Sequence, residues 1–360
     1  MIQSFDLIVA LLIACVSTFI LTIPVRALAM KFEVLDHPNR RKIHENPTPR
    51  LGGVAIFIGS YLGILYLQPQ HEHLWEIFFG SLIIVIIGAL DDRFELRPYV
   101  KLGGHIAAAA LVISSGLVIE KITLPFFGVV ELGFISVLVT FIWIIGITNA
   151  INLIDGLDGL ATGVTTIAFT SMLIMAMIDV RVVAAYFCIV LIGSNLGFLY
   201  HNFYPAKIYM GDSGSNFLGY MIAVVSILGL FKNIALLSFI IPVILLAVPI
   251  FDTFFAIVRR IKNKESIMVA DNYHVHYQLL RAGYTHRGAV VIIYVFSAVF
   301  GVLAVLFAKA SITFALLITA LVLVVLHLLA EMAGIVLGGR RPVIDAYKRL
   351  FVRKKNVEDR

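Results

Sequence analysis

The sequence predicts an all-α integral membrane protein with about eleven transmembrane helices, its N-terminus outside and its C-terminus inside the cell. Of the 360 residues, 60% are hydrophobic and only 14% are charged, whereas soluble domains are roughly 45–50% apolar and about 25% charged. The apolar residues form repeated runs long enough to cross a bilayer, which takes about 20 residues. Lys and Arg residues gather between alternate runs. These three observations together predict the fold class.

Each apolar run is predicted to be a helix, because an isolated strand cannot satisfy its backbone hydrogen bonds in lipid. The first run has no basic stretch before it, so we interpret it as a retained span and not as a signal peptide. The segment 120–132 is too short to cross and is expected to form a small hairpin at the outer surface. The predicted spans are 6–29, 51–67, 74–90, 102–119, 133–154, 160–178, 182–200, 214–231, 234–258, 289–308 and 312–329.

The orientation follows from the basic residues. With the N-terminus outside, all but four of the 28 Lys and Arg residues fall in inner segments; Lys121, Arg181, Lys232 and Lys309 are the exceptions. Cytoplasmic loops carry such an excess. The chain divides into a membrane domain, 1–337, and a basic cytoplasmic tail, 338–360, which we interpret as an anchor for anionic lipid. Nucleic-acid binding is not expected.

Two adjacent carboxylates, Asp91 and Asp92, end the third span in the stretch GALDDRFELRP. An Asp at a helix centre in the membrane costs about 2.5–3.5 kcal/mol. Adjacent carboxylates also repel, so one takes up a proton unless a cation is near. Bound Mg²⁺ or basic side chains would keep both ionised. The simpler alternative is a polar end of the span that is balanced by Arg93.

Four polar residues are spaced three apart in NAINLIDGLDGL, namely Asn149, Asn152, Asp155 and Asp158. On a continuous helix each such step turns by about 60°, which would spread the set around half the helix. The glycines after the two aspartates predict that the helix opens here, so that the side chains face one cavity. Amide and carboxylate oxygens suit a hard cation and the hydroxyls of a nucleotide. A polar turn between spans is the alternative.

The stretch YMGDSGS, 209–215, opens the eighth span. Small residues followed by a helix start predict an anion-binding helix N-terminus with free N–H groups. Asp212 beside it could hold a metal that bridges to phosphate. Alternatively, Asp212 or Ser213 caps the helix and no ligand is needed.

The longest inner loop contains DNYHVHYQLLRAGYTHR, 271–287, which includes His274, His276, Arg281 and Arg287. The HxH pair could bind zinc, but a zinc site needs further ligands in a closed set, and no neighbour supplies them with familiar spacing. The interleaved arginines favour phosphate binding instead. A surface loop with incidental histidines is the alternative.

The first inner loop, DHPNRRKIHENPTPRLGG, 36–53, supplies Lys42, His44 and Arg50. These residues either capture an anionic headgroup or simply provide the positive charge of an inner loop. Residue types alone do not separate the two interpretations.

Taken together, the motifs resemble the polyprenyl-phosphate N-acetylhexosamine-1-phosphate transferases, the WecA/TagO/MraY superfamily. The matching stretches lie in order between Asp36 and Arg287 and include PIFDTFFAIVRR in addition to the motifs above. The HVHYQLLRAGYTHR loop is similar to that of the GlcNAc-1-phosphate branch, which starts O-antigen, common-antigen or teichoic-acid lipid intermediates. That branch often reads HxHH, and Tyr277 stands here at the last histidine position.

The resemblance implies a reaction in which UDP-GlcNAc and undecaprenyl phosphate give GlcNAc-diphospho-undecaprenol and UMP, with Mg²⁺ or Mn²⁺, at the cytoplasmic face of the bacterial inner membrane. It also implies a possible homodimer. Another UDP-hexosamine donor is an alternative. A lipid or anion transporter is the non-enzyme alternative, but its charges would lie near the bilayer midplane within internal repeats, and this sequence has no repeat.

Carried onto this sequence, the resemblance gives each motif a role. Asp91 and Asp92 help to position the metal and the lipid phosphate, with Asp92 and Asp212 as the metal ligands. Asp155 and Asp158, with Asn149 and Asn152, line the nucleotide and metal pocket. The diphosphate and sugar are held by His274, His276, Arg281 and Arg287, and the lipid headgroup is attracted by Lys42, His44 and Arg50.

Overall fold

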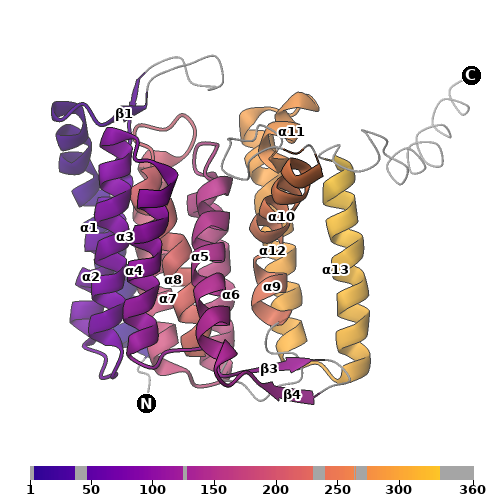
Figure 1. The fold of residues 1–360 in the computed structure, drawn as a ribbon. Coiled ribbons are helices and arrows are strands. Elements are labelled where there is room, and N and C mark those ends of the chain that lie inside the picture. Colours follow the sequence, from indigo (N-terminus) through magenta and orange to yellow (C-terminus); the bar gives the residue numbers. More distant parts are fainter. Residues whose placement is uncertain are drawn as a thin grey trace, which may run out of the picture.

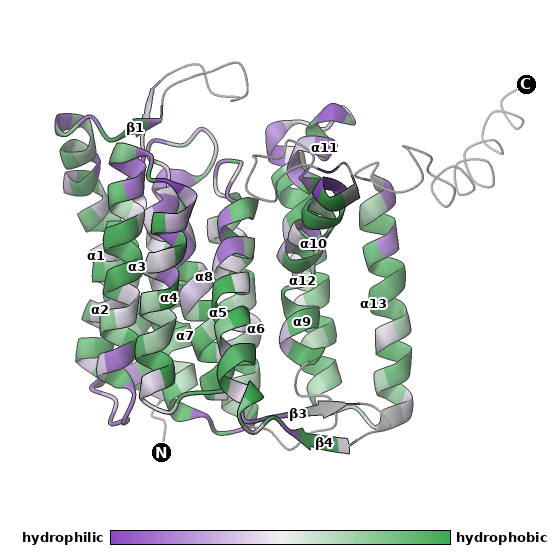
Figure 2. Cartoon of the chain, in the orientation of Figure 1, coloured by the Kyte–Doolittle hydropathy of each residue, from purple (hydrophilic) through white to green (hydrophobic). Residues whose placement is uncertain are grey.

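The computed structural model describes residues 4–36, 47–124, 128–229, 240–262, 264 and 274–332. Long helices run side by side across the molecule, with polar loops and the short helix α11 at one end and a β-hairpin at the other (Figure 1). Apolar residues fill the middle of the helices and hydrophilic residues gather toward the two ends (Figure 2). This distribution is typical of a protein whose central part is surrounded by the hydrocarbon core of a bilayer.

The described helices overlap the predicted spans with shifted ends, except for a short additional helix, Val275–Arg281. Up to residue 229, the described part of the chain contains α1 (Ser4–Lys31), α2 (Gly52–Leu67), α3 (Leu74–Phe94), α4 (Pro98–Ser114), α5 (Ile135–Ile154), α6 (Leu160–Ile178), α7 (Val182–Asn202) and α8 (Gly211–Gly229). The later part contains α9 (Ile240–Leu245), α10 (Ala247–Lys262), α11 (Val275–Arg281), α12 (His286–Ala308) and α13 (Ile312–Met332).

Seven of the described helices are long and apolar enough to cross a membrane, and α2 and α4 are shorter apolar helices. An all-α membrane protein is therefore confirmed in its coarse form. The number of eleven spans and the orientation stay predictions. The ninth predicted span, 234–258, contains α9 and α10, and its first residues lie outside the described part.

The predicted outer hairpin is present. Strands β3 (Lys121–Leu124) and β4 (Gly128–Glu131) pair antiparallel, at the end of the molecule opposite α11 (Figure 1). A second small sheet was not predicted: β1 (Leu35–Asp36) pairs with β2 (Thr48–Pro49). The next residue, Arg50, forms a bridge with Tyr209 in the loop before α8. The first inner loop is thereby joined to the 209–215 motif.

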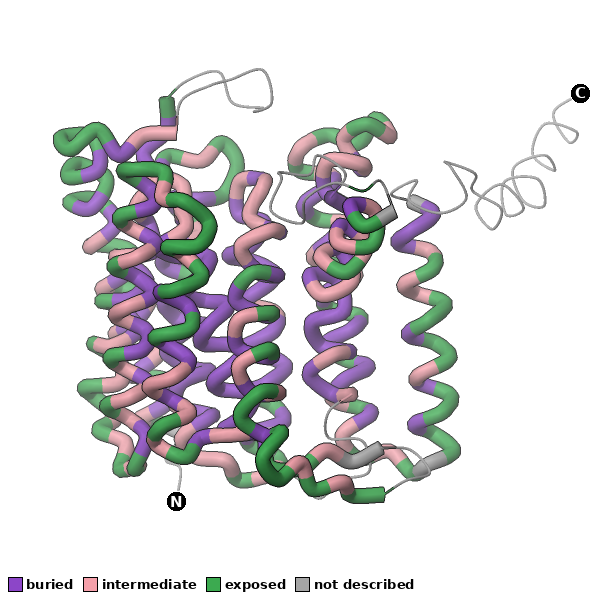
Figure 3. The backbone as a smooth tube through the Cα atoms, in the orientation of Figure 1, coloured by how far each residue is buried: buried purple, intermediate pink, exposed green. Residues whose placement is uncertain are grey.

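Helix α8 is the core of the molecule, and every residue from 213 to 229 is buried. It is packed by α3 and α5 and by the neighbouring α2, α6 and α7, so the centre of the bundle is buried while the outer helices are exposed on one side (Figure 3). Small residues allow this close packing: a Cβ at Gly53 of α2 would overlap the backbone at Gly214 of α8. Small residues at helix contacts are typical of membrane bundles.

Candidate active site

A cavity of about 290 Å³ opens at the end of the bundle where α3, α5 and α7 end and α8 begins. Segments distant in the sequence meet there, since β1, the residue after β2, the α5–α6 turn, the 203–210 loop and α11 all contribute. Its lining consists of Asp36, Arg50, Asn152, Asp155, Gly156, Leu157, Asp158, Asn202, Tyr204, Tyr209, Gly211, Asp212, Tyr277 and His286. Carboxylates and hydrogen-bonding groups predominate, which is suited to a polar ligand and a cation.

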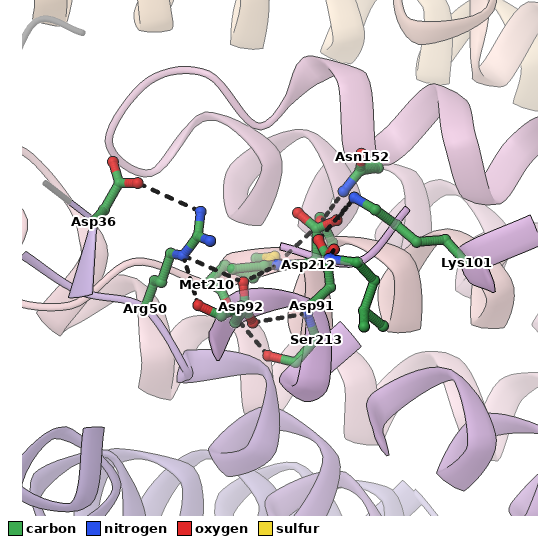
Figure 4. Close-up of polar contacts among 12 residues, drawn as sticks. Asp36, Arg50, Asp91, Asp92, Lys101, Asn152, Met210, Asp212 and Ser213 are labelled. Atoms are coloured by element: carbon green, nitrogen blue, oxygen red, sulfur yellow. Dashed lines mark hydrogen bonds and ion pairs between the residues drawn. The ribbon is translucent and has the colours of Figure 1, made fainter. Parts of the chain in front are cut away.

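A chain of charged groups joins α3, α4 and α8. Lys101 Nζ lies 2.7 Å from Asp91 Oδ2 and 3.0 Å from Asp212 Oδ2 (Figure 4). The other Asp91 oxygen accepts a 2.7 Å hydrogen bond from the Leu96 amide, just past the end of α3. One ammonium group is thus shared by two carboxylates and holds Asp212 at the cavity. Asp91 itself does not line the cavity.

Asp92 binds the start of α8. Its carboxylate accepts hydrogen bonds from the amides of Asp212, at 2.8 Å, and Ser213, at 3.1 Å (Figure 4). Arg50 Nε lies 3.7 Å from Asp92 Oδ1, and Arg50 Nη1 lies 3.4 Å from Asp36 Oδ1. The predicted anion site at this helix N-terminus is therefore filled by a carboxylate from α3. Asp92 places Asp212 and does not itself line the cavity.

The turn between α5 and α6 is open, as predicted. Helix α5 ends at Ile154, and Gly159, with φ of +75°, precedes α6. Asp155 and Asp158 both line the cavity. Burial, together with the nearby carboxylates of Asp212, Asp158 and Asp36, raises the pKa of Asp155 to about 7. This crowding of negative charge is the condition that a bound cation relieves.

Two hydrogen bonds fix the position of Asp158. Its Oδ2 accepts from the Ala206 amide at 2.8 Å, and its own amide donates to His286 Nε2 at 3.0 Å. The side chain of Asn152 donates to Ser215 Oγ on α8 at 2.9 Å. The turn is thus tied to the 203–210 loop, to α12 and to α8.

Helix α11 covers one side of the cavity. Tyr277 lines it, and His276 packs against Gly156, which also lines it. His276 is buried, and among the described residues neither of its ring nitrogens has a hydrogen-bond partner. Burial lowers its pKa to about 3, so the ring is neutral. Tyr277 contacts the same ring, with centroids 4.2 Å apart.

The structure brings together only part of the predicted site. Arg50, Asn152, Asp155, Asp158 and Asp212 line the cavity, whereas the other predicted residues that are described do not. Asn149 is exposed and donates to the Ile145 carbonyl at 2.7 Å. Arg281 is exposed on the last turn of α11. Arg287 donates to the Tyr204 carbonyl at 3.2 Å and so supports the cavity rim. Lys42 and His44 lie outside the described residues.

Comparisons with known proteins identify the family of this chain. A sequence profile of glycosyl transferase family 4 matches residues 74–230. The chain is 41% identical, over 96% of its length and 98% of the relative's, to a Bacillus subtilis protein named probable undecaprenyl-phosphate N-acetylglucosaminyl 1-phosphate transferase. It is 35% identical, over 86% and 85% of the two chains, to decaprenyl-phosphate N-acetylglucosaminephosphotransferase of Mycobacterium tuberculosis.

This chain belongs to the polyprenyl-phosphate N-acetylhexosamine-1-phosphate transferase family. A further relative, from Yersinia pestis, is undecaprenyl-phosphate alpha-N-acetylglucosaminyl 1-phosphate transferase, 29% identical over 78% of this chain and 79% of the relative. The family assignment made from the ordered motifs is thereby confirmed.

Several residues of this transferase site were missed by sequence reasoning. Lys101 was read only as inner-loop charge, because the fourth span was predicted to begin at 102, whereas α4 begins at Pro98. Proline at the first position of a helix is a start signal that could have revealed this. Tyr209 begins the quoted YMGDSGS motif but was given no role, and Asn202 lies outside the quoted motifs. Asp252 lies in the stretch PIFDTFFAIVRR, which resembles the family, but no residue that it contacts was predicted.

The transferase cavity has donors suited to Mg²⁺. Asp212, Asp155 and Asp158 supply carboxylates and Asn152 an amide. Among the described residues, no three His, Cys, Asp or Glu side chains are grouped closely enough to form a metal site by themselves. Mg²⁺ in nucleotide sites commonly uses one or two carboxylates and completes its shell with phosphates and water. The residues therefore fit this ion, with Asp212 the ligand best placed.

Gly156→Ala is expected to lower transferase activity by at least about tenfold, because misplacing a group near a reacting centre by about 1 Å can cost up to 10²-fold. A Cβ there would overlap His276 Nε2 and lie 2.7 Å from His276 Cε1, so His276 or the turn must move. Overpacking of this kind also costs about 1–3 kcal/mol of stability. Steady-state kinetics and a thermal melt would measure both effects.

Gly146→Ala is the matched control, because a Cβ at that position of α5 meets nothing within 4 Å. Adding His276→Ala to Gly156→Ala should restore stability by removing the clash. Normal activity of Gly156→Ala would show that the contact between α11 and the turn is not needed.

Proposed function

We propose that this chain transfers N-acetylglucosamine 1-phosphate from UDP-GlcNAc to undecaprenyl phosphate, giving GlcNAc-diphospho-undecaprenol and UMP. The observation that carries the proposal is the 41% identity to the Bacillus subtilis relative over 96% of the chain. Such similarity covers every element that lines the cavity, and not only one domain. The product is the first lipid intermediate of a cell-surface glycan.

The reaction is a phosphoryl transfer between two anions. An oxygen of undecaprenyl phosphate attacks the phosphorus that carries the sugar, the bond from this phosphorus to the bridging oxygen breaks, and UMP leaves with the bonding electrons. Catalysis of this kind depends on positioning and on neutralising charge. Mg²⁺, when bound, neutralises the diphosphate and orients it for in-line attack.

The chain's own residues have the following proposed roles. Asp212 holds the metal. Asp91 positions Asp212 through Lys101, and Asp92 positions it by binding the start of α8. Asn152, Asp155 and Asp158 bind the nucleotide and metal. Tyr277 contacts the donor from α11 and is supported by the buried rings of His276 and His274. Arg287 supports the rim through Tyr204. Arg50 attracts the lipid phosphate, together with Lys42 and His44.

The membrane setting supports this proposal. The acceptor is a lipid whose phosphate lies at the bilayer surface, and the residues that line the cavity lie at the ends of the helices and not at their midpoints. We place this end in the cytoplasm of a bacterial cell, where UDP-sugars are made, with the β3–β4 hairpin outside. A homodimer is compatible with this orientation.

The test is UMP release by detergent-solubilised full-length protein with UDP-GlcNAc, undecaprenyl phosphate and Mg²⁺. Release is expected only with both substrates, and EDTA is expected to reduce it to background, because two anions then meet without charge neutralisation. Restoration by excess Mg²⁺ or Mn²⁺ would exclude damage by the chelator. UDP-GalNAc in place of UDP-GlcNAc tests the donor. A folded protein that releases no UMP from any UDP-hexosamine would contradict the proposal and favour a transport role.

A further inference from the structure

One buried carboxylate outside the cavity fastens α11 to the membrane helices. Asp252 of α10 is 2% exposed, and both of its oxygens are engaged. Oδ2 lies 3.0 Å from His274 Nδ1, and Oδ1 accepts a 3.0 Å hydrogen bond from the Val275 amide. His274 is 4% exposed, so this contact is closed to water. An ionisable residue buried in this way is expensive and needs a reason.

The Val275 amide explains one half of the contact. Helix α11 begins at Val275, and its N-cap residue, His274, makes no capping hydrogen bond with its own side chain. The first amides of a helix need acceptors. Asp252 on α10 supplies such an acceptor for the Val275 amide, so the start of α11 is fixed to α10.

The His274 ring explains the other half. A carboxylate on one ring nitrogen fixes the tautomer and the ring orientation, and leaves the other nitrogen for a ligand. In His274, Nδ1 carries the proton and donates it in a hydrogen bond to Asp252, so Nε2 is the nitrogen that remains able to accept a hydrogen bond from a ligand. The His274 and His276 rings are stacked, 5.8 Å apart and within 6° of parallel. Fixing the first ring therefore also fixes the second, which packs on Gly156 at the cavity.

We propose that Asp252 is a positioning residue for the transfer reaction, which holds His274 and α11 in register with the cavity so that Tyr277 meets the donor. It does not touch the substrates. This inference rests on the proposed function, since it assigns Asp252 to the binding of the sugar-nucleotide donor. It predicts a defect in donor use that passes through His274.

The test compares Asp252→Asn, His274→Ala and the double variant by kcat and KM for UDP-GlcNAc. Asn has nearly the shape of Asp, but its NH2 group is a donor. It therefore cannot replace the two carboxylate oxygens that contact the His274 ring and the Val275 amide. Asp252→Asn is expected to raise KM about tenfold or more, with a smaller change in the KM for undecaprenyl phosphate. The double variant is expected to be no worse than His274→Ala alone, because residues that act through one another are not additive.

Asp179→Asn is the matched control, because that carboxylate pairs with Lys309 at the opposite end of the bundle, at 2.8 Å, and its loss should leave both KM values unchanged. Asp252→Glu retains the charge and should recover part of the donor affinity.

Three results would overturn the inference: wild-type kinetics for Asp252→Asn, equal effects on both substrates, or effects of the two single variants that multiply in the double variant. If Asp252→Asn does not fold, Asp252→Glu takes its place, and the single variant Asp252→Glu is compared with the double variant that also carries His274→Ala. Wild-type protein is assayed in parallel. A wild type without turnover would count against the proposed function, whereas an active wild type with normal variants counts against Asp252 alone.

Discussion

Asp212→Asn is expected to lower the rate of UMP release by about 10²- to 10³-fold, the usual effect of removing one electrostatic group from a reacting centre. Asp212 is the member of the Asp91–Lys101–Asp212 chain that lines the cavity. Asn keeps the shape and the helix start but loses the charge that would hold a cation. The variant should therefore fold normally. Turnover at saturating substrate and a size-exclusion profile measure the two parts of this expectation.

Asp6→Asn is a suitable control for this prediction, since Asp6 accepts a hydrogen bond from Tyr66 at the far end of the bundle. It should remain active. A rate for Asp212→Asn within a few-fold of wild type would remove Asp212 from the proposed metal site.

Lys101→Met is expected to impair both activity and stability. Lys101 is the shared partner of Asp91 and Asp212, and without it two carboxylates face each other with no cation between them. Breaking a buried charge contact costs about 3–5 kcal/mol, and the partial exposure of Lys101 reduces this to about 2 kcal/mol. Activity should fall by at least about tenfold, because Asp212 loses the contact that orients it. Thermal melts and turnover measure the two effects.

Two further variants make this result specific. Lys101→Arg keeps the charge and should retain more activity than Lys101→Met. Lys309→Met breaks the ion pair with Asp179 at the other end of the molecule and should leave turnover unchanged. Equal losses for the Lys101 and Lys309 variants would mean that Lys101 contributes only general stability.

Much of the site could be found in the sequence because its chemistry is local. The NAINLIDGLDGL motif carries its ligands and the glycine that ends the helix within a dozen residues. The open turn between Ile154 and Leu160 therefore followed from residue types alone. Asn149 does not line the cavity, for a local reason as well: it precedes the opening and is exposed on the continuous helix.

By itself, the sequence determined that the chain crosses a membrane as helices, and that its polar motifs alternate with the spans so as to meet at one end. Length, hydropathy and order decide both, because lipid permits only helices with internally satisfied backbones. Tertiary structure alone decided which polar group meets which. Asp92 caps a helix that begins at Gly211, Lys101 joins two carboxylates of other helices, and Asp252 holds His274. Such partners are set by close packing around α8, and no local pattern of residues encodes that packing.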